Sequence, residues 1–191
     1  MRAMLVVLMM LSISSVEAVS LKSMIRDGES LIVADKTSGK IYVYDEGLKR
    51  VEYAPALYGR SLANSISDIN SAPVTPSGEF RTRKVYSTQL GESITTFIEG
   101  ETSILAIHPV WLKSPKQRRL ERLASDDAAD NRITNGCINV PKKFYYDIMN
   151  KLDDGVKLVV LAEGVVLEND IGKDVLQKED SGGFSGKSGL N

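Results

Sequence analysis

The chain contains one cysteine and one histidine, two residue types that can act as a nucleophile and its base. Cys137 lies in the segment Thr-Asn-Gly-Cys-Ile-Asn at residues 134–139. His108 follows the apolar run 104–107, a pattern that predicts a buried strand with the imidazole at its end. Because a thiol nucleophile needs a base and the chain offers only this imidazole, the sequence predicts a Cys-His pair.

The reactivity of such a pair depends on the charge of its thiol. A free cysteine has a pKa of about 8.5, so its thiolate is a minority form at neutral pH. We expect a His108 imidazolium, and more weakly the amino end of a helix starting at Pro141, to lower that pKa. Backbone N–H groups around Gly136 and Cys137 suit an oxyanion hole, and the missing Cβ of Gly136 lets a scissile carbonyl approach closely.

The first 18 residues predict a secretory signal. Met1-Arg2 precedes an apolar stretch over residues 3–11, and small residues stand at Val16 and Ala18. The alternative is a membrane anchor, but the apolar stretch is shorter than the roughly 20 residues that span a bilayer. We therefore expect export to the periplasm or cell surface, cleavage after Ala18, and no membrane span in the mature chain.

Export changes the meaning of the lone cysteine. Outside the cytoplasm a structural cysteine normally has a disulfide partner, and an unpaired one indicates a reactive thiol or an intermolecular bridge. The alternative is that Cys137 is a small buried hydrophobe. Its flanking glycine and asparagine favour reactivity.

Length and charge limit the classes of partner. The chain has 191 residues and a formal net charge of −1, which suits one domain and offers no broad basic field. We expect neither nucleic acid nor a membrane surface as a partner, and no metal or cofactor. The oligomeric state is left open.

The elements that must position the pair are mainly β, with a few helices. Hairpins are predicted around residues 37–39 and 100–101, with a long polar loop over 59–76 between them. Strands are predicted over 30–35, 40–45, 51–58, 79–82, 95–99, 103–108 and 156–161, and helices over 117–124 and 141–152.

Three separated motifs together resemble the YkuD-type L,D-transpeptidases, and the resemblance covers roughly residues 30–162. The resemblance predicts a β-sandwich-like catalytic domain over 30–163, after a lead-in over 19–29 and before a flexible tail over 164–191. The matching residues are Thr134, Gly136, Cys137, Ile138 and Asn139 in the cysteine motif, Thr75, Pro76, Gly78 and Phe80 in an upstream turn, and His108.

The resemblance implies an enzyme that acts on peptidoglycan stem peptides without a cofactor. The cysteine would attack the carbonyl of the third residue of a tetrapeptide stem, usually diaminopimelate, release D-alanine and form a thioester. A second stem, a D-amino acid or a lipoprotein would supply the acceptor amine. If water is the acceptor, the protein is an L,D-carboxypeptidase; a catalytically silent peptidoglycan-binding module is the other alternative.

The resemblance also assigns roles around the pair. The backbone carbonyl of Pro109 would orient the imidazole. Asn135 stands where relatives often have histidine; it can form hydrogen bonds but cannot titrate. We expect Thr134 and Asn139 to brace the loop through bonds to the backbone.

Two features near the motif have open roles. Arg132 is a candidate to bind a stem-peptide carboxylate, the alternative being a solvated loop arginine. The gap of 25 residues between His108 and Thr134 is longer than the family's usual spacing. The extra residues fall in the polar stretch over 113–131, which is either a lid or an inert surface insertion. Trp111 and Tyr86 are candidates to line the cleft, although aromatics at strand ends are more often part of a core.

Overall fold

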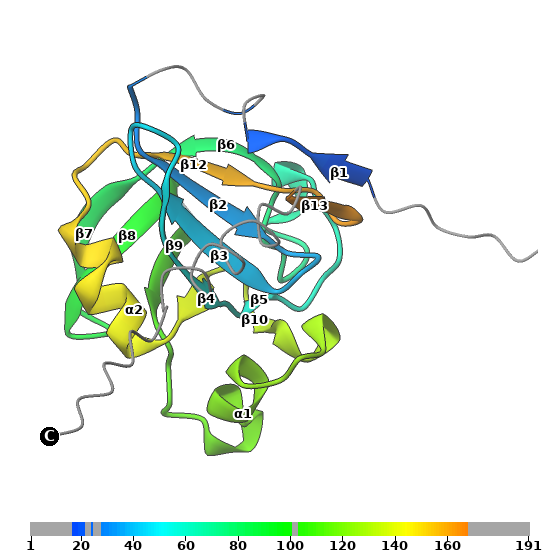
Figure 1. The fold of residues 1–191 in the computed structure, drawn as a ribbon. Helices are drawn as coiled ribbons and strands as arrows, with labels where there is room; N and C mark the ends of the chain where they lie inside the picture. Colours follow the sequence, from blue (N-terminus) through cyan, green and yellow to red (C-terminus); the bar gives the residue numbers. More distant parts are fainter. Residues whose placement is uncertain (1–16, 22–23, 25–27, 101–102, 168–191) are drawn as a thin grey trace, which may run out of the picture.

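The computed structural model describes residues 17–21, 24, 28–100 and 103–167. The fold is mainly β with short helices, as predicted (Figure 1). The strands are β1 (Glu17–Val19), β2 (Leu31–Asp35), β3 (Lys40–Tyr44), β4 (Arg50–Pro55), β5 (Tyr58–Gly59), β6 (Gly78–Arg81), β7 (Arg83–Ser87), β8 (Glu92–Glu99), β9 (Ile104–Pro109), β10 (Arg132–Thr134), β11 (Ile138–Val140), β12 (Lys157–Val160) and β13 (Val165–Leu167). The α-helices are α1 (Arg119–Leu123) and α2 (Lys142–Asp147), and the 3-10 turns are η2 (Ile66–Asp68), η3 (Pro115–Gln117), η4 (Ala128–Asn131) and η5 (Met149–Lys151).

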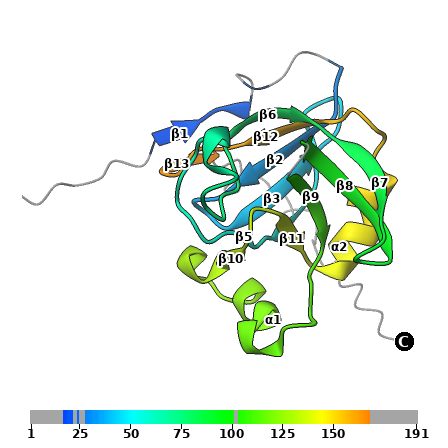
Figure 2. The same ribbon diagram turned by 180° about the vertical axis from the view of Figure 1, so that it is seen from behind.

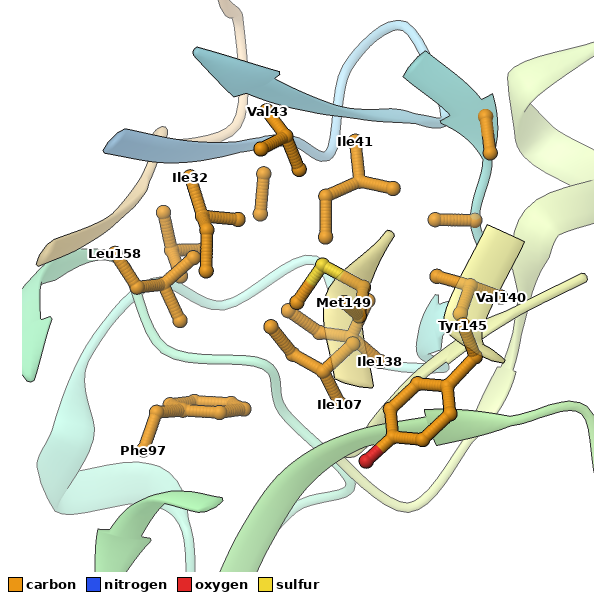
Figure 3. Close-up of a cluster of buried hydrophobic side chains, with 14 of the residues drawn as sticks. Ile32, Ile41, Val43, Phe97, Ile107, Ile138, Val140, Tyr145, Met149 and Leu158 are labelled. Carbon is orange, nitrogen blue, oxygen red and sulfur yellow. The ribbon is translucent and has the colours of Figure 1, made fainter. Parts of the chain in front are cut away.

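Two larger sheets form the body of the protein. One has the strand order β4-β3-β2-β12-β6 and the other the order β11-β9-β8-β7. Apolar side chains from both sheets and from α2 and η5 meet in one core (Figure 3). This arrangement fits the expected sandwich-like packing, in which each sheet buries one face against the other.

Strand β2 is buried along its whole length, and its first four residues are apolar because both of its faces are covered. Ile32 and Ala34 point into the core between the sheets, whereas Leu31 and Val33 belong to a second apolar cluster on the outer face. Each fully buried Leu, Ile or Val side chain stabilises the fold by about 1.5–3 kcal/mol relative to an exposed one. The central strand therefore anchors both apolar clusters.

The outer cluster extends the domain beyond its predicted ends. Leu21 and Met24 are buried in it, and so is Leu167 of β13, which pairs in parallel with β1. Residues 165–167 thus belong to the folded body rather than to a tail. The remaining tail, 168–191, and residues 1–16 of the predicted signal lie outside the described residues. Within the described part of the chain, no helix has the length and apolar character needed to cross a membrane.

Most predicted strands are present, with differences at their ends. The segment 51–58 divides into β4 and β5, and the helix expected over 141–152 consists of α2 followed by η5. Strand β7 was not predicted, because its side chains are polar or half-exposed where it forms the edge of its sheet. Its antiparallel pairing with β8 holds this segment as a strand, although its own sequence does not indicate one.

The insertion over 113–131 carries η3, α1 and η4 and lies on one side of the sheets, next to β5 and β10 (Figures 1 and 2). Leu123 packs with Leu57 and Val110 in a third apolar cluster. Asn131 is buried and its amide donates to the carbonyl of Gly39 over 3.0 Å. The insertion is therefore attached to the body by its own buried contacts.

Candidate active site

Parallel pairing of β9 and β11 brings the two reactive residues together, although they are far apart in sequence. Asn139 pairs with His108 and Ile138 pairs with Ile107, so Cys137, one residue earlier, lies at the end of β11 nearest Ala106. Figure 2 shows the two strands side by side. The pairing places the thiol and the imidazole at the same region of the sheet.

Cys137 and His108 both line one cavity of about 480 Å³. His108 is only 7% exposed, and the Cys137 side chain is half-buried. The cavity's other walls come from β7, the turn after it, β8, β9 and the insertion. The lining residues are Val85, Tyr86, Ser87, Thr88, Gln89, Leu90, Ile94, Ile104, Ala106, His108, Trp111, Arg119, Thr134, Asn135, Cys137 and Asn139.

Hydrogen bonds on both ring nitrogens fix the tautomer of His108. Its Nδ1 lies 2.8 Å from the carbonyl oxygen of Pro109, and its Nε2 lies 3.0 Å from the side-chain amide nitrogen of Asn139. Arg119 has only donors and bonds Asn139 Oδ1, so the Asn139 NH₂ faces the ring. Nδ1 therefore carries the proton and donates to Pro109, while Nε2 accepts. The expected role of the Pro109 carbonyl is confirmed.

The imidazole is held in its neutral form. Burial is the main cause that lowers the pKa of His108, and the positive charge of Arg119 lowers it further. The Pro109 hydrogen bond and, more weakly, the charge of Glu92 oppose this shift. The Nε2 lone pair of this neutral ring accepts from the Asn139 NH₂, and it can take a proton once that hydrogen bond is given up.

The thiol is also neutral at rest, which corrects the expected activation by an imidazolium. Burial raises the pKa of Cys137, while a hydrogen bond with the Ala106 backbone and the charge of Arg119 oppose the rise. Helix α2 begins at Lys142, after the three residues of β11 and Pro141. The pair is thus thiol and imidazole at rest, so an attack by this sulfur would require transfer of the thiol proton.

Two threonines hold the loop that carries Cys137. Thr134 Oγ1 donates to the Cys137 carbonyl over 2.6 Å and accepts from the Gly136 N–H over 3.1 Å, as the predicted bracing requires. Thr75 Oγ1 donates to the Gly136 carbonyl and accepts from the Gly59 N–H, both over 2.9 Å. The Gly136 N–H is therefore already used within the loop and is not a free oxyanion donor.

Gly136 is required by the fold of the loop rather than by the approach of a substrate. Its φ of +127° is a conformation that L side chains rarely adopt. A Cβ at this position would lie 2.5 Å from the backbone carbonyl oxygen of Val74 and 2.9 Å from Leu105 Cδ2. The absent side chain lets the loop pack against the protein, which corrects the interpretation drawn from sequence.

Arg132 does not lie in the cavity, which corrects its predicted role as a carboxylate-binding residue. Its Nη2 donates to Glu163 Oε2 and to the Lys36 carbonyl, both over 2.7 Å, and its guanidinium lies 5.6 Å from the ring centre of Tyr58. Because Glu163 already supplies the carboxylate, Arg132 acts as a half-buried structural cation. It fixes the start of β10 below the cysteine loop.

The two asparagines of the motif have different surroundings. Asn135 is exposed at the cavity, and its Oδ1 accepts from Arg60 Nη2 over 2.8 Å. Asn139 is buried and joins His108 to Arg119 through its side chain. The bonds of the Asn139 side chain go to other side chains rather than to the backbone, contrary to the prediction.

Comparison with known proteins gives matches among solved structures. No protein-family model matches the sequence, and no curated protein matches it significantly. An L,D-transpeptidase (Yku) from Stackebrandtia nassauensis is 13% identical with a TM-score of 0.45, over 74% of this chain and 60% of that one. An L,D-transpeptidase from Mycobacterium tuberculosis H37Rv is 17% identical with a TM-score of 0.45, over 69% and 57%.

The catalytic domain of the E. faecium L,D-transpeptidase is 17% identical with a TM-score of 0.43, over 72% of this chain and 100% of that domain. All three structures carry the name L,D-transpeptidase. This chain spans less than two thirds of the Stackebrandtia and Mycobacterium structures. At these identities, the chemistry of this protein has to be argued from its own side chains.

The sequence does not establish that three residues line the cavity: it leaves Trp111 and Tyr86 open between cleft and core, and it gives no signal for Arg119. Trp111 and Tyr86 both line the cavity. Arg119 lies in the polar insertion, where one arginine among many charged residues gives no distinguishing signal. Its importance follows only from the fold, which directs its guanidinium to Asn139.

Proposed function

We propose that this protein is a cysteine-dependent L,D-transpeptidase that acts on the tetrapeptide stems of peptidoglycan. The observation that carries the proposal is the shared cavity of Cys137 and His108, with the imidazole held by Pro109 so that Nε2 faces the cavity residue Asn139. The cysteine motif at 134–139 and the turn at 75–80 support the choice of this family. Export to the periplasm or cell surface, through the signal at 1–18, is part of the proposal.

In the acylation step, His108 Nε2 gives up its hydrogen bond from Asn139 and takes the proton of the Cys137 thiol. The sulfur attacks the carbonyl carbon of the third stem residue and forms a tetrahedral intermediate. The C–N bond to D-alanine then breaks, and the imidazolium gives its proton to the leaving amine. The product is a thioester on Cys137, and the imidazole is neutral again.

In the transfer step, an acceptor amine attacks the thioester carbonyl. The amine proton passes to His108 Nε2 as the new C–N bond forms, the C–S bond breaks, and the departing sulfur recovers that proton. Two stems become joined through their third residues. Water in place of the amine would give a free carboxylate, which is the carboxypeptidase alternative.

The test is incubation of the purified protein with isolated sacculi, followed by mass spectrometry of the muropeptides. We expect dimers joined through two diaminopimelate residues, and no such products from the Cys137→Ala variant. Tripeptides alone would favour a carboxypeptidase. If the wild-type protein binds the sacculi but leaves them unchanged, the silent peptidoglycan-binding module is favoured. If the Cys137→Ala variant gives products, the mechanism is contradicted.

Trapping of the nucleophile gives a second test. Carbapenems acylate members of the family that the motifs resemble, so we expect a carbapenem to add its mass to Cys137. Because the chain has one cysteine, a peptide map identifies the modified residue without ambiguity. His108→Ala should slow the acylation strongly, since the thiol is neutral at rest and then has no base.

A further inference from the structure

Arg119 gives the cavity a positive charge that the proposed chemistry does not use. Among the described residues that line the cavity, it is the only one with a permanent charge. Arg60 lies close by, since it contacts Asn135 and its charge acts on Arg119. No aspartate or glutamate is among the described lining residues. The cavity is therefore poised to accept a negatively charged group.

Within the described part of the chain, hydrogen bonds hold this guanidinium in place but engage fewer than half of its donors. Arg119 Nε donates to Gln117 Oε1 over 2.7 Å, and Nη1 donates to Asn139 Oδ1. A guanidinium has five N–H donors, so these bonds use two of them. The side chain is half-buried, which limits competition from water. A planar, fixed guanidinium of this kind suits a carboxylate.

The position of Arg119 limits where that carboxylate can be. Asn139 is the single side chain between the guanidinium and His108 Nε2, and the charge of Arg119 acts on both His108 and Cys137. One residue of extended chain spans about 3.5 Å. A carboxylate bound by Arg119 would thus belong to a residue next to the scissile bond.

We propose that Arg119 is a specificity-determining residue that binds a carboxylate of the acyl donor beside the scissile bond. This inference rests on the proposed function. In a tetrapeptide stem, two groups supply that chemistry: the terminal carboxylate of the leaving D-alanine and the side-chain carboxylate of the diaminopimelate. Either one would select stems with a free carboxylate over amidated stems.

The first experiment measures kcat/KM for three donors: a free tetrapeptide stem, the same stem with a C-terminal amide, and the same stem with a diaminopimelate side-chain amide. We expect the wild-type full chain to lose about 10- to 100-fold on one of the amides, the amount typical of a hydrogen bond to a charged group. That amide identifies the bound carboxylate. In Arg119→Gln, kcat/KM for the free stem should fall by a similar factor. Its kcat/KM for that amide should stay close to the wild-type value for the same amide.

The matched control is Arg118→Gln. Arg118 is the neighbouring arginine, but it is exposed, pairs with Glu121 and does not line the cavity. It should keep the wild-type preference among the donors. Equal losses on all three donors in Arg119→Gln, or no effect of either amide in the wild type, would overturn the inference.

The second experiment does not require peptidoglycan turnover. Iodoacetate and iodoacetamide alkylate the same thiol but differ in charge, and Cys137 is the only cysteine in the chain. We expect the ratio of the iodoacetate rate to the iodoacetamide rate to fall about tenfold in Arg119→Gln, by loss of one charged contact, and to stay unchanged in Arg118→Gln. An unchanged ratio in Arg119→Gln would overturn anion binding at this site.

The two experiments separate the two proposals. Turnover of stems without discrimination would leave the proposed function standing and reject the role of Arg119. An altered alkylation ratio without turnover of any stem would reject the proposed function and retain an anion site beside Cys137. Circular dichroism of each variant shows whether it has folded.

Discussion

At the scale of single residues, the main finding is that the candidate nucleophile and base are both neutral at rest. Burial raises the pKa of Cys137 and lowers that of His108, so each loses its charged form for the same physical reason. In the proposed mechanism, attack by the sulfur is then coupled to proton transfer. This makes the ring's orientation, set by Pro109 and Asn139, as important as its presence.

The lowered pKa of His108 predicts the acid side of the pH profile. The base must be unprotonated to act, so activity is lost as the pH falls through the folded-state pKa of His108. Because burial lowers that pKa, the midpoint of the acid limb of kcat/KM should lie below about 6.5, the ordinary value for histidine. An NMR titration of the untagged protein reads the same pKa, since it has one histidine. A midpoint above 6.5 would contradict this reading of the site.

Substitution of Asn139 tests how the ring is held. In Asn139→Asp, a carboxylate would replace the NH₂ donor at Nε2 and favour the imidazolium. We expect the pKa of His108 to rise and the acid limb of the pH profile to move to higher pH. Asn139→Leu is the control, because it removes the hydrogen bond without adding a charge. If both variants give the same pH profile, the Asn139 amide does not control the proton on the ring.

At the scale of elements, the parallel pairing of β9 and β11 and the packing of the cysteine loop create the site. Thr75 comes from the long loop before β6, yet it donates to the carbonyl of Gly136. Lys36 Nζ in turn donates to the Thr75 carbonyl over 2.9 Å. The loop that carries Cys137 is thus held by segments from both halves of the domain.

Gly136→Ala tests that packing, with Gly155→Ala as its control. Both glycines have positive φ, but a Cβ at Gly155 would meet nothing within 4 Å, whereas one at Gly136 would meet Val74 O at 2.5 Å. We expect Gly155→Ala to lower the free energy of unfolding by about 1–2 kcal/mol through backbone strain alone. Gly136→Ala should cost clearly more and slow alkylation of Cys137. Equal costs in thermal or urea unfolding would show that the loop can move away from Val74.

At the scale of the whole molecule, a buried charged cluster ties the strands to the loops. Lys36 is 1% exposed and bonds Asn64 Oδ1 over 2.8 Å, and its ammonium lies 3.7 Å from the carboxylate of Glu163, which also pairs with Arg132. Burial is the main cause that lowers the pKa of Lys36 to about 8. The cluster therefore stabilises specific contacts while carrying the cost of a buried ammonium.

That cost predicts how stability depends on pH. Between about pH 8 and 10.5 the unfolded chain keeps the proton on Lys36 while the folded chain has lost it. Stability from this group therefore rises with pH across that window and is constant below it. The difference in the free energy of urea unfolding between wild type and Lys36→Met should grow in favour of wild type from pH 8 to pH 10. Parallel curves would mean that the pKa of Lys36 is not lowered.

Much of the chemistry could be predicted from local sequence. The β-branched runs predict β2, β3 and β9 because strand-forming side chains alternate with turn residues over a few positions. The lone Cys137 and His108 stand out as the candidate reactive pair because no other residues of these types compete. The role of the Pro109 carbonyl was implied by the resemblance to the YkuD-type L,D-transpeptidases, and the backbone supplies that carbonyl whatever the side chain is.

Only the tertiary structure decided which arginine serves the site. Arg132 is close to Cys137 in sequence but is held by Glu163, whereas Arg119 is 18 positions away and lines the cavity. The residue type determines that a guanidinium donates hydrogen bonds to acceptors, but long-range packing determines which acceptors lie within hydrogen-bonding distance. For the same reason the sequence alone determined that a thiol and an imidazole are available, and the pairing of β9 with β11 determined that they face one cavity.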